Sequence, residues 1–284
     1  MKKHIKKRSP LSWMFRIVMY CTLIFFALCA LIPLASVIVT AFKTDAEYTA
    51  TNVMTMPQSW LNFENFVQAF QMANMGRAFF NSFVVLICVL AGSTIIGTQL
   101  AYVLNRFKFP GNGLIRNLFL FASLLPGIAM QVSVYEIMYK LGFINHLYGY
   151  IIMLMGTDVI AIYIYIQFME NVSTSLDESA IIDGASYFQI YSKIIFPLLK
   201  PAIVTSMILK GVATYNEYIY ANLYLQKEHL KTVACSLYTF TGPLGSRYNL
   251  ICAGVIISII PVFVIFILCQ KQIYSGIAAG GVKG

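Results

Sequence analysis

The chain has 284 residues, of which 11% are charged and 59% are apolar or aromatic, whereas an average soluble domain is about 25% charged. A soluble globule could not bury so much apolar surface, so this composition excludes a disordered chain, a coiled coil and a free soluble enzyme, and it favours a polytopic membrane protein. The net charge of +9 then has to be interpreted from where the basic residues lie, because a bilayer sorts cations.

The N-terminal segment predicts a retained first membrane span. The basic run MKKHIKKR is followed by an apolar run from Ile17 to Phe42. This run of 26 residues is longer than the roughly 7–15 apolar residues of a secretory signal. We therefore expect it to stay in the protein as a transmembrane helix.

Apolar stretches near 20 residues predict an all-α fold with six transmembrane helices. No stretch alternates with a period of two, as the strands of a membrane barrel do. The six ranges are 17–42, 79–105, 117–138, 147–168, 202–225 and 248–270. The six cysteines and three histidines have no spacing typical of a disulfide framework or a metal site, so we expect no metal and no cofactor.

The basic residues predict the orientation of the spans. With a cytoplasmic N-terminus, thirteen Lys and Arg residues fall in inside segments and six in outside segments, as the positive-inside bias requires. Both termini are then cytoplasmic. The basic N-terminal run is explained by this orientation and by contact with lipid headgroups, so it gives no support to nucleic-acid binding.

The longest outer segment, residues 43–78, predicts a short amphipathic helix at the outer membrane surface. Phe63, Phe66, Val67 and Phe70 recur there at helical spacing.

The long inner segment predicts two capped helices. Ser175 with Glu178, and Ser186 with Gln189, form capping-box patterns, and Gly184 suits the left-handed position that ends the first helix. The second helix carries an apolar stripe, which consists of Tyr187, Ile190, Tyr191, Ile194 and Ile195. Two readings of this helix pair stay open at this point: it rests on the membrane or on the chain's own helices, or it docks into a soluble partner.

The same segment resembles the coupling loop of permease subunits of ATP-binding-cassette importers. Their motif is EAA, three residues, G, nine residues, I-x-L-P, and this chain matches it at Glu178, Ser179, Ala180, Gly184, Ile194, Phe196 and Pro197. Ser179 replaces the first Ala and Phe196 replaces Leu. The ending GIAAGGVKG resembles that of maltose-type permeases, GLTAGAVKG. The resemblance implies a type I importer permease fold.

In this family the loop seats in a cleft of the ATPase subunit, and the glycine-rich tail reaches into the ATPase dimer. The resemblance implies that docking involves Glu178, Ser179, Ala180, Asp183, Gly184 and Ala185 in the loop and Ala279, Gly280 and Gly281 in the tail. A frayed terminus is the alternative for the tail. The chain lacks GxxxxGK[ST], so ATP hydrolysis is expected in a partner.

The resemblance also divides the chain into three parts. A basic arm, the first span and an outer loop occupy residues 1–76, the transmembrane domain with its coupling loop at 175–197 occupies residues 77–270, and the cytoplasmic tail occupies residues 271–284.

Ionisable and polar groups inside the spans predict a pathway, because such groups usually face a bundle interior. On a continuous helix Lys210 and Glu217 stand about 10.5 Å apart, too far for a direct pair, and Asp158 is a plausible partner for Lys210. The segment at Tyr215–Tyr218 resembles the W-N-E-[FY] stretch of carbohydrate permeases. The candidates are Gln131, Tyr135, Asp158, Lys210, Asn216, Glu217 and Tyr218. A structural ion pair and an interfacial tyrosine belt are the alternatives.

The resemblance therefore predicts a subunit of an ATP-driven sugar or oligosaccharide importer in the bacterial inner membrane. The implied partners are a second, homologous permease, an ATPase dimer, an extracytoplasmic solute-binding protein, the sugar and the bilayer. A non-sugar solute is the near alternative. A stand-alone secondary transporter is disfavoured because no inverted repeat is visible, and a membrane enzyme is disfavoured because the sequence has no catalytic constellation.

Overall fold

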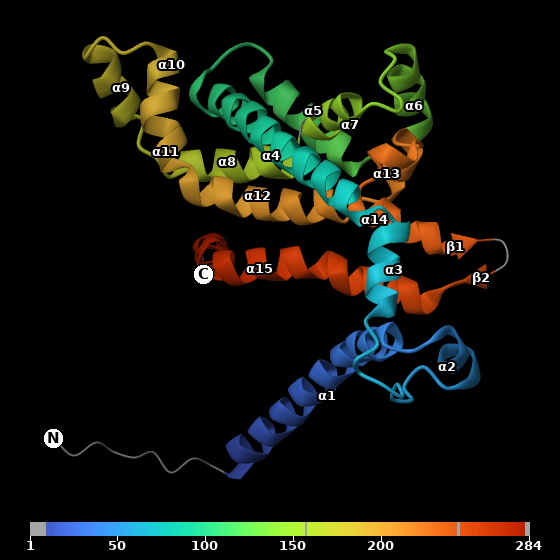
Figure 1. Ribbon diagram of the computed structural model, residues 1–284. Helices are drawn as coiled ribbons and strands as arrows, with labels where there is room; N and C mark the ends of the chain where they lie inside the picture. The colour runs from blue at the N-terminus through green and yellow to red at the C-terminus, as the bar shows by residue number, and fades with distance from the viewer. Residues whose placement is uncertain (1–9, 157, 243–244, 282–284) are drawn as a thin grey trace. The chain divides into compact units, whose positions relative to one another are not determined.

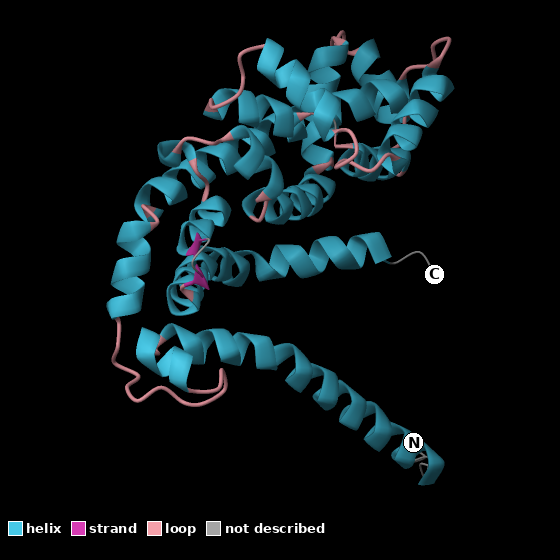
Figure 2. Cartoon of the chain, turned by 90° about the vertical axis from the view of Figure 1, so that its right-hand side faces the viewer, coloured by secondary structure: helices cyan, strands magenta, loops and turns pink. Residues whose placement is uncertain are grey.

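The computed structural model describes residues 10–156, 158–242 and 245–281, and this part of the chain is mostly helical (Figures 1 and 2). The helices are α1 Pro10–Ala41, α2 Asp45–Ala50, α3 Glu64–Met72, α4 Met75–Arg106, α5 Asn112–Leu124, α6 Gln131–Lys140, α7 Leu147–Met155, α8 Val159–Glu170, α9 Ser175–Ile182, α10 Tyr187–Ile190, the π-helix η1 Tyr191–Ile195, α11 Phe196–Leu198, α12 Lys200–Tyr215, α13 Ile219–Tyr224, the 3-10 helix η2 Glu228–Leu230, α14 Val233–Ser236, the 3-10 helix η3 Leu237–Phe240 and α15 Tyr248–Gly281. Two short strands, β1 Thr241–Gly242 and β2 Gly245–Ser246, pair antiparallel.

The predictions for the two chain ends concern residues that lie outside the described ranges. These residues are the basic run within residues 1–9 and the last three residues of the tail, 282–284. The tail residues Ala279, Gly280 and Gly281 form the last turn of α15.

Within the described ranges, three helices are long and apolar enough to cross a membrane. They are Trp13–Ala41, Met75–Arg106 and Tyr248–Leu268. Two bent pairs also qualify if each is counted as one span, namely Leu147–Met155 with Val159–Glu170, and Tyr187–Leu198 with Lys200–Tyr215. Lipid-facing apolar surface explains why only 6% of the most apolar window of the first helix is buried within the protein. The chain is therefore a multi-pass helical protein.

Three predicted spans differ from the single helices that we expected. The range 147–168 contains α7 and α8, and Asp158 caps the start of α8. The range 117–138 contains α5 and α6, because Pro126 lacks a donor and disfavours the helical conformation at Leu125, whose ψ is 129°. The range 202–225 contains α12 and α13, and α12 ends at Tyr215. Glu217 thus lies beyond the helix that carries Lys210, and the spacing expected for one continuous helix does not apply.

The chain divides into two compact units, of which the larger consists of residues 73–238 and 260–284. In this unit α4 packs against α7, α8 and α12 (Figure 1). One apolar core joins α4 and α8 to the segment that follows α9, through Ala101, Ile162, Ile190 and Ile195 among others. A second core lies around Val85, Val89, Tyr150 and Tyr224. α4 is therefore the helix on which the elements of this unit are assembled.

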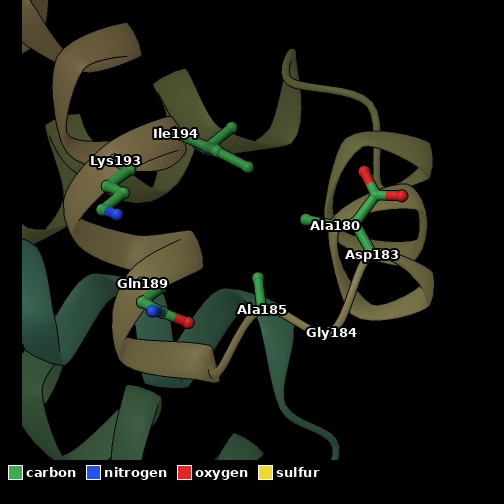
Figure 3. Close-up of a pocket in the computed structure, with 7 residues that line it drawn as sticks. All are labelled: Ala180, Asp183, Gly184, Ala185, Gln189, Lys193 and Ile194. Carbon is green, nitrogen blue, oxygen red and sulfur yellow. The ribbon is translucent and has the colours of Figure 1, made fainter.

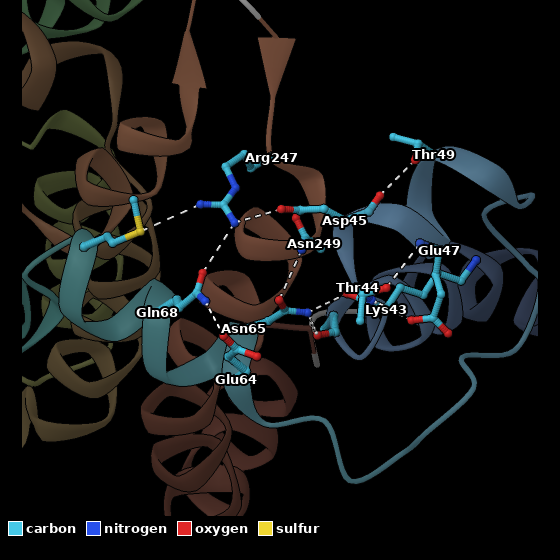
Figure 4. A network of polar contacts seen from close by, with 12 residues as sticks. Lys43, Thr44, Asp45, Glu47, Thr49, Glu64, Asn65, Gln68, Arg247 and Asn249 are labelled. Atoms are coloured by element: carbon cyan, nitrogen blue, oxygen red, sulfur yellow. Dashed lines mark hydrogen bonds and ion pairs between the residues drawn. The ribbon is translucent and has the colours of Figure 1, made fainter.

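The smaller unit consists of residues 1–72 and 239–259, and polar side chains connect its parts (Figure 4). The buried Asn65 amide donates to the carbonyls of Ala41 at 2.8 Å and Lys43 at 2.7 Å, and its oxygen accepts from Asn249 at 3.1 Å. Arg247 pairs with Asp45 at 3.0 Å. The helix predicted within residues 43–78 is confirmed as α3, and its Asn65 amide satisfies the Ala41 carbonyl at the end of α1.

Candidate functional site

The loop between α9 and α10 has the turn that its glycine predicts. Gly184 has a φ of +83°, a left-handed conformation that glycine adopts without a steric penalty. The Ala185 N–H donates to the Ala180 carbonyl at 2.9 Å, and the Gly184 N–H donates to the Ile181 carbonyl at 3.0 Å. These bonds close the C-terminal turn of α9 and reverse the chain into α10.

One of the two predicted capping boxes is confirmed and the other is wrong. The Ser186 hydroxyl accepts from the Gln189 N–H, and the Gln189 side chain accepts from the Ser186 N–H. At the start of α9, Thr174 is the N-cap and makes no side-chain cap bond. The reason is local: the Ser175 N–H donates to the Ser173 hydroxyl at 3.2 Å, and the two serine hydroxyls bond to each other.

Most of the apolar stripe of the second helix faces the protein's own core, although Tyr187 at its start is exposed. Ile190, Tyr191 and Ile195 are buried there. The exposed apolar side chains of this segment are instead mostly on α9, where Ile182 is 86% exposed. They are Leu176, Ile181, Ile182, Tyr187 and Phe188. The exposure of the α9 residues could not be predicted from the sequence, because an eight-residue helix is too short for its periodicity to show which face is buried.

An open hollow lies between α9 and the start of the next helical segment (Figure 3). Four of the residues predicted for docking line it: Ala180, Asp183, Gly184 and Ala185. Gln189, Lys193 and Ile194 line the opposite side. Glu178 and Ser179 are exposed on α9 but do not line the hollow. The loop thus combines an open turn with exposed apolar side chains on α9.

An ion pair that the sequence analysis did not predict holds α9 against α4. Arg106 Nε lies 2.7 Å from Asp177 Oδ2, and both side chains are largely buried. Burial raises the pKa of the Asp177 carboxyl, and the Arg106 guanidinium opposes that rise. Arg106 and Asp177 lie far apart in the sequence, so no local pattern of residues predicts this contact.

The pairing predicted for Asp158 and Lys210 is confirmed. Lys210 Nζ lies 3.8 Å from Asp158 Oδ2, and each side chain is 21% exposed. The Asp158 carboxylate also caps α8, because it accepts from the Ala161 N–H at 3.1 Å. Glu217 has a separate local bond, since its Oε1 accepts from the Tyr220 N–H at 2.8 Å.

Three other pathway candidates, Gln131, Tyr135 and Tyr218, form a second group around α6 and α13, whereas Asn216 lies at the end of α12. The Tyr224 hydroxyl donates to Gln131 Oε1 at 2.8 Å, and the Tyr135 ring lies 5.8 Å from the Tyr224 ring. Tyr218 stacks on Tyr238 with ring centroids 3.7 Å apart. The Asn216 amide donates to the Val212 carbonyl. No described contact joins this group to the Asp158–Lys210 pair, so the structure divides the predicted pathway residues into two clusters.

Within the described ranges, no three His, Cys, Asp or Glu side chains are grouped so that they could hold a metal ion.

Comparisons with known proteins agree with the resemblance inferred from the loop. Residues 93–274 match the family described as "Binding-protein-dependent transport system inner membrane component". The chain is 30% identical over 252 residues to the "Probable starch degradation products transport system permease protein AmyC" of Thermoanaerobacterium thermosulfurigenes, with 88% of this chain and 91% of that protein covered. It is 27% identical to the "Arabinooligosaccharides transport system permease protein AraQ" of Halalkalibacterium halodurans, with 98% and 99% covered.

Among solved structures, the fold is similar to a chain of a bacterial ABC transporter involved in the import of the acidic polysaccharide alginate. The TM-score is 0.81 at 24% sequence identity, and 93% of this chain and 98% of that chain are covered. At this identity the likeness shows the fold, which is that of an importer permease.

Proposed function

The chain belongs to the family of binding-protein-dependent transport system inner membrane components, and from this premise we propose that it is a permease subunit of an ATP-driven importer for a sugar or oligosaccharide. Relatives named for starch products and arabinooligosaccharides support the substrate class. A relative named for melibiose, raffinose and stachyose supports it too. The observation that carries the proposal is the exposed α9 turn, with its left-handed Gly184 and apolar Ile182, on an otherwise membrane-type protein.

In this proposal the chemistry and the specificity come from partners. An ATPase dimer docks on α9 and the loop at residues 183–186, and the tail residues Ala279, Gly280 and Gly281 reach toward it. A second, homologous permease completes the pathway, and an extracytoplasmic binding protein delivers the solute. ATP-driven closure of the ATPase dimer shifts the permease between conformations by binding one of them better.

The proposed topology has six crossings, with both termini in the cytoplasm of a bacterium. α1, α4 and α15 cross singly, α7 with α8 forms one bent crossing, α12 with α13 forms one over the range 202–225, and α5 with α6 forms one broken crossing around Pro126. Residues 1–76 then form the arm, first span and outer loop, residues 77–270 form the transmembrane domain, and residues 271–284 form the tail. Broken helices fit a transport pathway, because non-helical backbone at membrane depth is tolerated where it lines a cavity.

The proposed pathway contains both clusters of polar residues. Gln131, Tyr135, Asn216, Glu217 and Tyr218 offer amide, carboxylate and aromatic groups, which suit a sugar because its C–H faces stack on rings and its hydroxyls form hydrogen bonds. Asp158 and Lys210 form a charged contact farther along the same unit.

Reconstitution tests the proposed function. The chain is co-expressed with candidate ATPase, second permease and binding-protein genes encoded beside it, purified through a tag on this chain, and placed in proteoliposomes. We expect the ATPase to co-purify, and uptake of labelled oligosaccharides to require both ATP and the binding protein. Uptake by the chain alone, indifferent to ATP, would refute the proposal. If only non-sugar solutes were taken up in an ATP-dependent way, the proposed substrate class would be wrong although the importer function would stand.

The exposed apolar side chain of Ile182 provides a direct test of docking. Burying an isoleucine contributes about 1.5–3 kcal/mol, so Ile182→Glu is expected to weaken ATPase binding by roughly 10- to 100-fold. The measurement is the dissociation constant of the purified ATPase from the chain in detergent or nanodiscs. Ile182→Leu is the control and keeps wild-type affinity. Equal binding of the ATPase to both variants would show that α9 is not part of the interface.

Two substitutions at Glu217 distinguish a role of its side chain in the pathway from a role in capping α13. Glu217→Gln keeps an oxygen that can accept from the Tyr220 N–H but removes the charge, whereas Glu217→Ala removes both. A hydrogen bond from a sugar hydroxyl to a carboxylate contributes about 1.5–3 kcal/mol, so we expect Glu217→Gln to lower uptake at least about tenfold with the ATPase still bound. Normal uptake by Glu217→Gln together with loss by Glu217→Ala would show that the side chain only caps α13.

A further inference from the structure

An ion pair joins α9 to the end of the transmembrane helix α4. Arg106 is the last residue of α4. Its Nε lies 2.7 Å from Asp177 Oδ2, with side-chain exposures of 8% and 14%. Its Nη2 also donates to the Val172 carbonyl at 2.9 Å. One guanidinium thus holds both α9 and the segment that leads into it.

A second contact joins the same face of α4 to the segment after Gly184. The Tyr191 and Thr98 hydroxyls are 2.8 Å apart in a buried position, and Thr98 donates to the Thr94 carbonyl at 2.7 Å. Tyr191 is therefore the donor in the bond to Thr98. Tyr191 begins the π-helical turn η1, a local irregularity that is often found at functional sites.

Aromatic rings fill the space between these two contacts. Tyr102 lies 5.6 Å from the Tyr191 ring and 5.7 Å from the Phe107 ring, and Phe107 lies 5.1 Å from the Tyr187 ring. Thr98, Tyr102 and Arg106 follow one another at steps of four, which places them on one face of α4. This face therefore contacts the loop on both sides of its glycine turn.

A buried ion pair is a poor means of adding stability, because desolvation offsets most of the attraction between its charges. The attraction holds the Asp177 carboxylate against the rigid, planar Arg106 guanidinium, and the bond from Arg106 Nη2 to the Val172 carbonyl fixes the orientation of that guanidinium. Nothing in the docking surface requires Asp177, since Asp177 faces α4 and not the hollow beside Gly184. The pair is therefore best explained by a need to hold α9 at a set angle to α4.

We infer that Arg106 and Asp177 are positioning residues that transmit movement of α9 to α4, so that closure of the ATPase shifts the transmembrane helix at the centre of the larger unit. This inference rests on the proposed docking function. When the pair is broken, α9 still presents Ile182 and the Gly184 turn to the ATPase, but its displacement is no longer passed to α4.

The test uses the reconstituted complex and two separate readouts. Asp177→Asn removes the charge with little change of shape, and Asp177→Glu keeps it. We expect Asp177→Asn to retain the ATPase at wild-type stoichiometry, while ATP-dependent uptake, and the stimulation of ATP hydrolysis by the loaded binding protein, fall at least fivefold. Asp177→Glu is expected to recover most of the stimulation.

Glu170→Gln is the matched control, because it removes the partner of Arg116 in a more exposed pair at 3.7 Å. We expect this variant to remain within twofold of wild type in both readouts. Wild-type stimulation and uptake in Asp177→Asn would overturn the inference while docking stands. Loss of the ATPase together with a lower melting temperature in Asp177→Asn would also overturn it, because the pair would then be structural. Absence of the ATPase from the wild-type complex would instead refute the proposed function.

Discussion

Gly184→Val is expected to abolish ATP-driven uptake and to release the ATPase from the purified complex, with membrane insertion intact. The φ of +83° at this position is unfavourable for any residue with a Cβ, by roughly 1–2 kcal/mol, and more for a β-branched side chain. Inside the chain a Cβ at this position would meet no atom within 4 Å. The open space is where the proposed ATPase surface would lie, so the valine would collide with the partner as well as strain the turn.

Two controls separate these causes. Gly184→Asn tolerates the left-handed conformation but still adds a side chain, so partial loss of docking in this variant would come from the contact itself. Gly111→Val carries similar backbone strain, because Gly111 has a φ of +90° and an equally open environment, yet it lies outside the docking loop. We expect it to keep the ATPase and most uptake. Equal losses of uptake and of bound ATPase in Gly111→Val and Gly184→Val would show that the Gly184→Val defect comes from backbone strain alone. The measurements are co-purification and proteoliposome uptake.

The second large effect is expected at the Asp158–Lys210 pair. Asp158→Asn leaves the Lys210 ammonium without its partner inside a span, where an unpaired charge costs about 2.5–3.5 kcal/mol on insertion scales. We expect a lower melting temperature, together with strongly reduced uptake. The double variant Asp158→Asn with Lys210→Met removes both charges and is expected to recover the melting temperature, because replacing a paired charge by apolar groups is often neutral.

Uptake by the double variant shows whether the Asp158–Lys210 pair takes part in transport or only stabilises the protein. If the two charges line the pathway, the double variant stays impaired although it is stable and still binds the ATPase. Recovery of uptake along with stability would contradict the pathway role and leave an interhelical ion pair. Thermal unfolding followed by fluorescence, and uptake at matched protein density in the vesicles, give the two values to compare.

Residues near one another in the chain were the ones that the sequence predicted best. Gly184 and the Ser186–Gln189 capping box depend on bonds that span only a few residues, so their chemistry is visible in a short window. The pairing of Lys210 with Asp158 was also predictable, because two opposite charges in neighbouring spans have few other partners. The family followed from the spacing of the loop motif.

Prediction failed where two signals competed or where a distant element intervened. The apolar count over residues 117–138 favoured one helix, but Pro126 broke it. Ser175 had the spacing of a cap, but Thr174 is the N-cap of α9, and the Ser175 N–H donates to the Ser173 hydroxyl. The stripe from Tyr187 to Ile195 was equally suited to a partner or to the chain's own core.

The sequence by itself determined the class of the protein, its apolar helices and the turn at Gly184, because scarce charge, apolar run length and glycine's freedom at positive φ are properties of local segments. The tertiary structure alone decided which face of the loop is free. Ile190, Tyr191 and Ile195 are buried against α4 and α8, whereas Ile182 is exposed. The tertiary structure also decided that Arg106 meets Asp177, since only folding brings the end of α4 to α9. The net charge of +9 gives no indication of this ion pair, because a composition counts the charged residues but does not show which of them are in contact.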